Sequence, residues 1–541
     1  MRNIKTDPEL KQLESRILHY ADVYKRTLPE MRFFILDPME FCSLLHKRVY
    51  PVSPVNIWEG KEMVNTRHRV ETGQESSLYY EVVQTGRPSY AYLNETNNAM
   101  TQASVMAHVV GHCEFSELNV MHDSNDDRTE WIIYLTNKVN ISRFQMGHQN
   151  YRTFWNACES VKALIAPNSQ FNLENSVDTD NNIPQEKTEV PEEKSLLDSM
   201  PYSSTVHNIF KGTQKAKDRL LKQEQLRHSR SEQISRTGYK LTAPCQDVLG
   251  FLEQYAPLSQ GEKYILQYMY AVNSTQDFVV RTQIMNEGWA MHWEKKIMTE
   301  LFKERACTGI IEYSKVCAGV MYPRPYFQRN PYHLGFYMWE HIEELYRDGK
   351  VNIDYCDEVD QEKKNNWKVK PKQEPIDAMG HIVKTCTDYE FLRRFLTTDL
   401  VEKFHLNRID KGQAKKLGLK ADDVVKESRQ YVWTDPEPVK GEMLNFFTHL
   451  YRPRIYIIDV DYMDGGILLF HRDDGRPLRK DWIRPTLKNI NLIWKGAACL
   501  LTKDSLFTYS AGSFNELRAA APRFDVVVER MQNGEKPFRA K

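Results

Sequence analysis

Two histidines spaced four residues apart are the side chains in this sequence best suited to metal chemistry. They are His108 and His112, in the stretch 106–119 (MAHVVGHCEFSELN). On a helix, residues at this spacing lie one above the other on the same face. HExxH metallopeptidases use the same spacing to place two imidazoles on one zinc ion. Such pairs also occur as ordinary core or surface residues, so the pair by itself does not define a site.

A second segment, 281–298 (RTQIMNEGWAMHWEKKIM), adds two carboxylates. If it is helical, Glu287 and Glu294 share one face with apolar residues. A buried carboxylate is costly unless a cation or several donors satisfy it, so these residues are either metal ligands or members of a buried salt bridge. Gly288 inside a helix costs about 1 kcal/mol relative to alanine, which indicates close packing against another backbone or a ligand.

Taken together, the two segments contain the elements of a known zinc site. Two histidines from one helix and a glutamate from a later helix form the His-His-Glu ligand set of the thermolysin-like peptidases. In those enzymes the glutamate ligand lies in an Asn-Glu dipeptide, which Asn286-Glu287 matches. The sequence therefore predicts that His108, His112 and Glu287 bind zinc or another divalent metal.

One departure from the peptidase pattern affects the mechanism. In HExxH the glutamate after the first histidine is the general base, and that position here is Val109. A hydrolase built on this site would take its base from elsewhere, and helical geometry makes Glu294 or His292 the candidate catalytic residue.

The elements that would position these residues follow from periodicity. Helical patterns cover 99–118, with Thr96 or Asn97 as the cap, and 247–255, 261–273, 277–304 and 332–348. Asn330 and Pro331 predict the start of the last of these helices. Strand patterns at 454–462 and 466–472 flank Asp464-Gly465, which predicts a hairpin. The expected fold class is α+β: a large, mainly helical domain followed by a small C-terminal α/β domain.

Changes in composition set the expected domain boundaries. Residues 1–166 form the first part of the core, with the histidine-rich helix, and 205–425 form its helical second part. Residues 167–204 are rich in acidic and polar residues, which predicts a disordered acidic insert. Residues 426–541 make up the small C-terminal domain.

Charge and cysteine content narrow the function classes. Lys+Arg and Asp+Glu are equal at 73 each in 541 residues, so the chain shows no charge bias toward nucleic acid or an anionic membrane. No run approaches the roughly 18 apolar residues of a membrane span. The N-terminus lacks a signal-peptide core. Nine cysteines, with no CxxC pair, indicate reduced thiols and a cytoplasmic protein.

Three sequence blocks resemble those of the stage V sporulation protein R (SpoVR) family. The family block AHVxGHxDF is matched at 107–115, with Glu114 in place of Asp. MNEGWA is matched at 285–290, and NPYxLGF at 330–336. Many relatives carry a histidine where this chain has Glu294, so the role of that position does not transfer directly.

The resemblance implies involvement in sporulation, through spore-cortex formation, or in a related stress programme. It also implies a PrkA-like serine protein kinase and a protein with a von Willebrand-type domain as partners. Two hypotheses stay open. The first is a metal-dependent hydrolase of peptide or amide bonds, similar to the gluzincins. The second is a non-catalytic regulatory or scaffolding protein that acts through protein partners.

Overall fold

The computed structural model describes residues 2–37, 40–41, 82–122, 128–166, 241–324, 329–351, 353–367, 369, 373–449, 452–473 and 477–539. The expected acidic insert, 167–204, lies outside these residues. The described chain has the predicted α+β class. It divides into unit 1, Met1–Ile132 with Ser274–Tyr451, and unit 2, Ile133–Asn273 with Arg452–Lys541. The domain boundaries expected from composition stay predictions.

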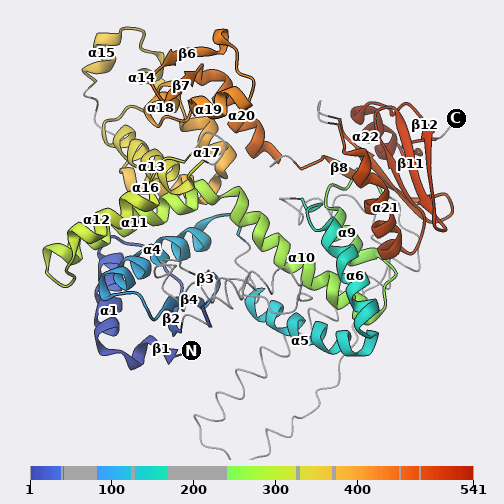
Figure 1. Ribbon diagram of the computed structural model, residues 1–541, viewed down its shortest axis with the longest axis horizontal. Coiled ribbons are helices and arrows are strands. Elements are labelled where there is room, and N and C mark those ends of the chain that lie inside the picture. The colour runs from blue at the N-terminus through green and yellow to red at the C-terminus, as the bar shows by residue number, and fades with distance from the viewer. Residues whose placement is uncertain are drawn as a thin grey trace, which may run out of the picture. The chain divides into compact units, whose positions relative to one another are not determined.

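Unit 1 begins with a four-stranded sheet in the order β1-β2-β4-β3 (Figure 1). Its strands are β1 (Arg2–Asn3), β2 (Met31–Leu36), β4 (Ser89–Asn94) and β3 (Val82–Gln84). The central pair, β2 and β4, is parallel, and the outer pairings are antiparallel. Helix α1 (Pro8–Val23) packs against helix α4 (Ala99–Leu118), and their apolar side chains share one core cluster with the sheet.

Helix α4 has the predicted bounds, but its N-cap is Asn98 rather than Thr96 or Asn97. The Asn98 side chain accepts a hydrogen bond from Thr101 N at 2.8 Å. Every residue from Met100 to Ser116 is buried. A helix covered on all sides must satisfy each polar group it carries inside the protein. The two histidines on this helix therefore need partners from neighbouring elements.

The break between the helices expected at 261–273 and 277–304 lies further along the chain than predicted. Helix α10 (Gln260–Arg281) runs through the expected break at 274–276, and α11 (Gln283–Lys303) begins after Thr282. The reason is a cap from a distant element, α17 (Asp388–Phe395). The Asp388 carboxylate accepts hydrogen bonds from Ile284 N and Met285 N, both at 2.9 Å. This cap satisfies two free N–H groups of α11 and places Glu287 in its first turns.

Helix α13 (Pro331–Arg347) starts as predicted, with the Asn330 side chain accepting from Tyr332 N at 3.1 Å. Helix α11 packs against both α4 and α13 (Figure 1). The contacts are glycine-mediated: a Cβ on Gly111 would lie 2.5 Å from Ala290 Cα, and one on Gly288 would lie 2.5 Å from Gly335 Cα. Gly288 thus packs directly on another backbone, as its place in a helix indicated.

The rest of unit 1 surrounds this group of helices. A second core cluster, with Trp289, Trp293 and Trp339 fully buried, joins α11 and α13 to the helices that follow. A three-stranded sheet has the order β5-β7-β6, with strands β5 (Arg408–Asp410), β7 (Tyr431–Thr434) and β6 (Val424–Glu427). The other α-helices in the described part of this unit are α12 (Ile310–Val320), α14 (Ile353–Asp357), α15 (Gln361–Asn365), α16 (Pro375–Thr385), α18 (Thr398–Lys403), α19 (Lys411–Lys416) and α20 (Pro436–His449).

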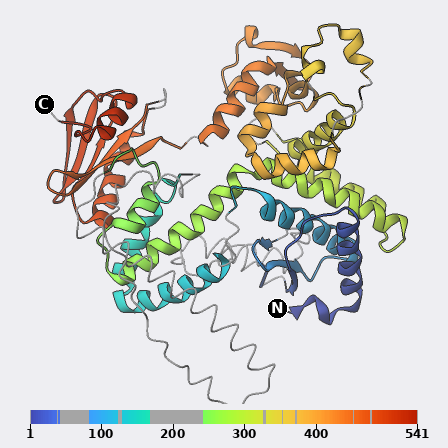
Figure 2. The ribbon, with the colours of Figure 1, turned by 180° about the vertical axis from the view of Figure 1, so that it is seen from behind.

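Unit 2 contains a five-stranded sheet, coloured orange to red in Figure 2. Its strand order is β12-β11-β10-β9-β8. The strands are β8 (Ile455–Tyr462), β9 (Gly466–His471), β10 (Ala498–Leu501), β11 (Ser505–Ser510) and β12 (Ser513–Arg518). Strands β8 and β9 form the predicted antiparallel hairpin, with positive φ angles at Asp464 and Gly465. Among the described residues, the helices of this unit are most of α5 (Arg128–Met146), α6 (His148–Val161), α9 (Val248–Tyr255), the first part of α10, α21 (Lys480–Trp494) and α22 (Phe524–Gln532).

Candidate metal centre

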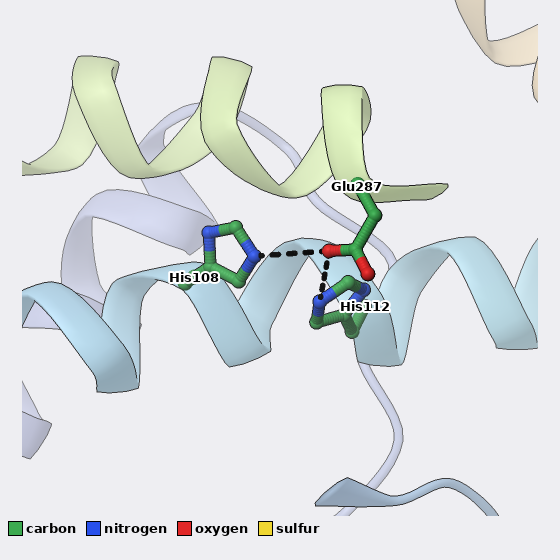
Figure 3. Close-up of side chains that lie close together, drawn as sticks. All are labelled: His108, His112 and Glu287. Carbon is green, nitrogen blue, oxygen red and sulfur yellow. Dashed lines mark ion pairs between the residues drawn. The ribbon is translucent and has the colours of Figure 1, made fainter. Parts of the chain in front are cut away.

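The predicted ligands come together where α4 and α11 pack. His108 and His112 project from α4 toward Glu287 of α11, and one carboxylate oxygen lies between the two rings (Figure 3). Glu287 Oε2 is 3.4 Å from His112 Nε2 and 3.7 Å from His108 Nε2. Ligand atoms bound to one tetrahedral zinc at about 2.0–2.1 Å would be roughly 3.3 Å apart. The observed spacing is close to that of a shared metal ion.

The electrostatics of Glu287 match those of a ligand. Its side chain is 18% exposed, but Oε2 is buried and makes no hydrogen bond with a described residue. Burial alone would raise the pKa of Glu287, but the adjacent His108 and His112 outweigh burial and lower the pKa to about 2. The carboxylate is therefore an anion at neutral pH. A buried anionic oxygen between two imidazoles is stabilised by a cation at that point.

Further hydrogen bonds hold both imidazoles in place. His108 Nδ1 lies 2.8 Å from Glu294 Oε2, and His112 Nδ1 lies 2.9 Å from Asn286 Oδ1. The contact with Glu294 turns Nε2 of His108 toward Glu287, and the Asn286 amide oxygen orients the His112 ring in the same way. Carboxylate or carbonyl partners of this kind orient histidine ligands in metal sites.

Glu294, one of the two predicted catalytic residues, has both oxygens engaged. Its Oε1 accepts a hydrogen bond from Ser104 Oγ, and its Oε2 contacts His108. The side chain is buried, at 6% exposure. These contacts are those of a residue that positions a ligand, and its catalytic role stays a prediction.

His292, the other predicted catalytic residue, faces α13 instead. Its Nδ1 lies 3.1 Å from Glu340 Oε1, and its Nε2 lies 3.5 Å from Glu343 Oε2. The structure thus brings His108, His112, Glu287 and Glu294 together and places His292 in a second cluster.

Two other residues of α4, Val109 and Glu114, lie outside the cluster of His108, His112 and Glu287. Val109, at the position of the HExxH base, is 1% exposed and belongs to the hydrophobic core. Glu114 accepts hydrogen bonds from Thr27 N at 3.1 Å and Trp289 Nε1 at 3.0 Å, and pairs with Arg26 at 3.3 Å. Burial raises the pKa of Glu114 against the opposing effect of Arg26. This buried ion pair joins the chain after α1 to α4 and α11.

Several residues of the site were missed by sequence reasoning. Ser104 lies one helical turn before His108, a spacing that could have indicated it. Glu340 and Glu343 lie three residues apart on a predicted helix, which also places them on one face. Tyr332, whose ring centroid is 6.0 Å from that of His108, belongs to the NPY motif, which the sequence predicts mainly as a helix start, with a substrate-facing loop as the alternative.

Fold and site together define an α+β protein in which two packed helices carry a buried His-His-Glu cluster. A family model described as "SpoVR like protein" matches residues 5–433, a range that holds all these side chains. The chain belongs to the SpoVR family.

One curated relative is the "Uncharacterized protein YcgB" of Escherichia coli (strain K12), 24% identical over 368 residues. The match spans 65% of this chain and 65% of that relative, just under two thirds of its length. No solved structure matches the chain significantly. Among the described residues, no helix is both long and apolar enough to cross a bilayer.

Proposed function

We propose that this SpoVR-family protein binds one divalent metal ion, zinc foremost, through His108, His112 and Glu287. The observation that supports this most directly is the buried Glu287 oxygen, which lies 3.4 and 3.7 Å from two imidazole nitrogens. His108, His112 and Glu287 would hold the ion, which would supply Lewis acidity, polarising a carbonyl and lowering the pKa of bound water to about 7. Catalytic zinc sites likewise use three protein ligands.

The chemistry proposed for this site is hydrolysis of a peptide or amide bond. Glu294 and Asn286 contact Nδ1 of His108 and His112 and so direct the Nε2 atoms of both rings toward Glu287, as a shared metal ion requires. Glu287 supplies the negative charge that offsets part of the charge of the metal. Of the two candidate bases, Glu294 is the nearer, since it already touches His108.

A second candidate function is a regulatory or scaffolding protein in which the metal is structural. Two observations favour it: the position of the HExxH base is the buried Val109, and both oxygens of Glu294 are engaged. In this case a PrkA-like kinase and a von Willebrand-type protein would be the partners through which it acts. Both candidates place the protein in sporulation, through cortex formation, or in a related stress programme.

Metal analysis of the purified chain tests the binding step. Wild type is expected to retain about one equivalent of tightly bound zinc per chain after a Zn²⁺ load and extensive desalting, and H112A and E287Q to lose it. E300Q removes a carboxylate from the same helix outside the site and serves as the matched control. A metal content below about 0.2 equivalents in wild type, unchanged in H112A, would sink the proposal.

Two further measurements separate the candidate functions. The Zn²⁺-loaded protein is incubated with peptidoglycan stem peptides, and the amount of newly formed free amine is measured. The same measurement on E287Q serves as the comparison. Release by wild type alone supports the hydrolase. Complementation of a sporulating host that lacks its own copy then tests the alternative. Full restoration by folded E287Q, at normal protein levels, supports a non-catalytic role.

A further inference from the structure

A second cluster of metal-binding side chains lies on the other face of α11, where this helix packs against α13. His292 is fully buried, with its ring stacked 6.2 Å from Trp289 and edge-on to Trp293 at 5.2 Å. Its two ring nitrogens face Glu340 and Glu343 of α13. One ligand atom from each of the three residues lies within 4.8 Å of the others.

The two ring nitrogens of His292 have different environments. Nδ1 is within hydrogen-bonding distance of Glu340 Oε1, at 3.1 Å. Nε2 makes no hydrogen bond with a described residue, and its nearest carboxylate oxygen, Glu343 Oε2, is 3.5 Å away. Nε2 of His292 is therefore a buried nitrogen directed at a carboxylate, with no hydrogen-bond partner among the described residues.

This arrangement repeats that of the first cluster. In both, a carboxylate lies against Nδ1 of a buried histidine while Nε2 faces a second carboxylate: Glu294 and Glu287 for His108, Glu340 and Glu343 for His292. A divalent cation between Nε2 and Glu343 would give His292 Nε2 the partner that it lacks among the described residues.

We infer that His292, Glu340 and Glu343 form a second divalent-cation site, separate from the one at His108, His112 and Glu287. An imidazole among the ligands favours zinc and similar transition metals over magnesium or calcium. The side chains of Glu340 and Glu343 are 34% and 23% exposed. The ion therefore reaches the site from solvent, and water completes its coordination.

Two lysines determine how tightly this site binds. Lys295 Nζ lies 3.1 Å from Glu340 Oε2, and Lys296 Nζ lies 3.0 and 3.2 Å from the two oxygens of Glu343. Both ammonium groups compete with a cation for the same carboxylates. Their side chains are 53% and 26% exposed, so each can turn into solvent when an ion binds. The second site is therefore weaker than the first, and removing Lys296 should strengthen it.

Zn²⁺ titration of the chelator-stripped full chain tests this inference, with a chromophoric chelator as competitor. Wild type should bind about two equivalents with different affinities. H292A and E343Q should lose the weaker equivalent, and E287Q the tighter one. K296M should tighten the weaker equivalent by about tenfold or more, because its competitor is gone. E344Q, which removes an exposed carboxylate from the same helix, should bind both ions with wild-type affinities.

Each alternative has its own outcome. A single equivalent in wild type that is lost in E287Q overturns the second site and leaves the first intact. Two equivalents in both H292A and E343Q assign the extra ion to adventitious surface binding. If K296M has wild-type affinity for both ions, Lys296 does not compete with the weaker ion, and that ion lies away from Glu343. E343Q changes a partly exposed residue, so it remains informative if H292A does not fold.

Discussion

At the scale of single residues, the hydrogen bond from His108 to Glu294 is the contact most open to direct test. Removing an orienting partner of a metal-bound histidine lowers metal affinity about 10–100-fold without changing the ligand count. E294A should therefore bind zinc at the first site about 10–100-fold more weakly, with unchanged stoichiometry. E294Q should retain most of the affinity, since its amide oxygen accepts the same hydrogen bond. Competition with a chelator of known affinity measures both.

The same variants also test the catalytic role predicted for Glu294. If Glu294 is the general base, E294A and E294Q both lose turnover while wild-type zinc affinity is kept. An affinity that falls in E294A and recovers in E294Q assigns the residue to positioning. S104A, which removes the other partner of the carboxylate, should give a smaller effect in the same direction.

The ion pair between Arg26 and Glu114 makes a separate prediction about stability. Both side chains are nearly inaccessible, at 5% and 2% exposure. Removing one member of a buried pair costs about 3–5 kcal/mol, because the other charge is left without compensation. E114Q should lower the free energy of unfolding in urea by that amount and leave zinc stoichiometry unchanged. A loss below about 1 kcal/mol would show that Arg26 finds another partner or reaches water.

At the scale of elements, the packing of α11 on α13 depends on two glycines. A Cβ on Gly288 would lie 2.5 Å from Gly335 Cα, closer than real Cβ contacts allow. G288A should therefore force the two helices apart and destabilise the protein by several kcal/mol, as overpacking does. Urea unfolding measures the loss. A Cβ on Gly380 in α16 would have no neighbour within 4 Å, so G380A should be neutral or stabilising. Equal behaviour of the two variants would contradict the close contact.

These glycine contacts give a physical reason for the sequence blocks. Gly111 belongs to the histidine-rich block, Gly288 to MNEGWA and Gly335 to NPYxLGF, and each lies at a helix–helix contact. The proposed metal ligands extend from the same turns, since His112 follows Gly111 and Glu287 precedes Gly288. The spacing between helices and the geometry of the site are therefore set by the same short stretches of sequence.

Local patterns predicted those elements whose start and end depend on nearby residues. The bounds of α4 and the Asn330 cap of α13 follow from residues within one turn. The start of α11 does not, since its N–H groups are capped by Asp388, 104 residues from Ile284. Periodicity alone placed the break before Asp277, among poor helix formers. A cap from so far along the chain has no local signal.

At the scale of the whole molecule, the cluster at His108, His112 and Glu287 could be predicted from local sequence patterns, whereas the cluster at His292 could not. His108 and His112 share a helix face by spacing alone, and an Asn-Glu dipeptide suggested their third ligand. The cluster at His292 depends on which face of α13 packs against α11, and nothing in the sequence near His292 specifies Glu340.

The chain has no net charge, yet unit 1 buries histidines and carboxylates where three helices meet. The stability of this unit should therefore depend on bound cations.

Thermal unfolding with Zn²⁺ and after chelator treatment tests whether bound cations stabilise the protein. A ligand that binds only the folded state stabilises it by RT ln(1 + [L]/Kd), about 2.7 kcal/mol at a hundredfold excess over Kd. Wild type loaded with Zn²⁺ should melt several degrees higher than after chelator treatment. E287Q should gain much less from Zn²⁺, because two imidazoles alone bind it weakly, and E300Q should behave as wild type. If Glu287 instead neutralises a buried cationic side chain, E287Q melts earlier than wild type and chelator changes neither protein. Wild-type melting that is indifferent to both Zn²⁺ and chelator would exclude a stabilising metal at His108, His112 and Glu287.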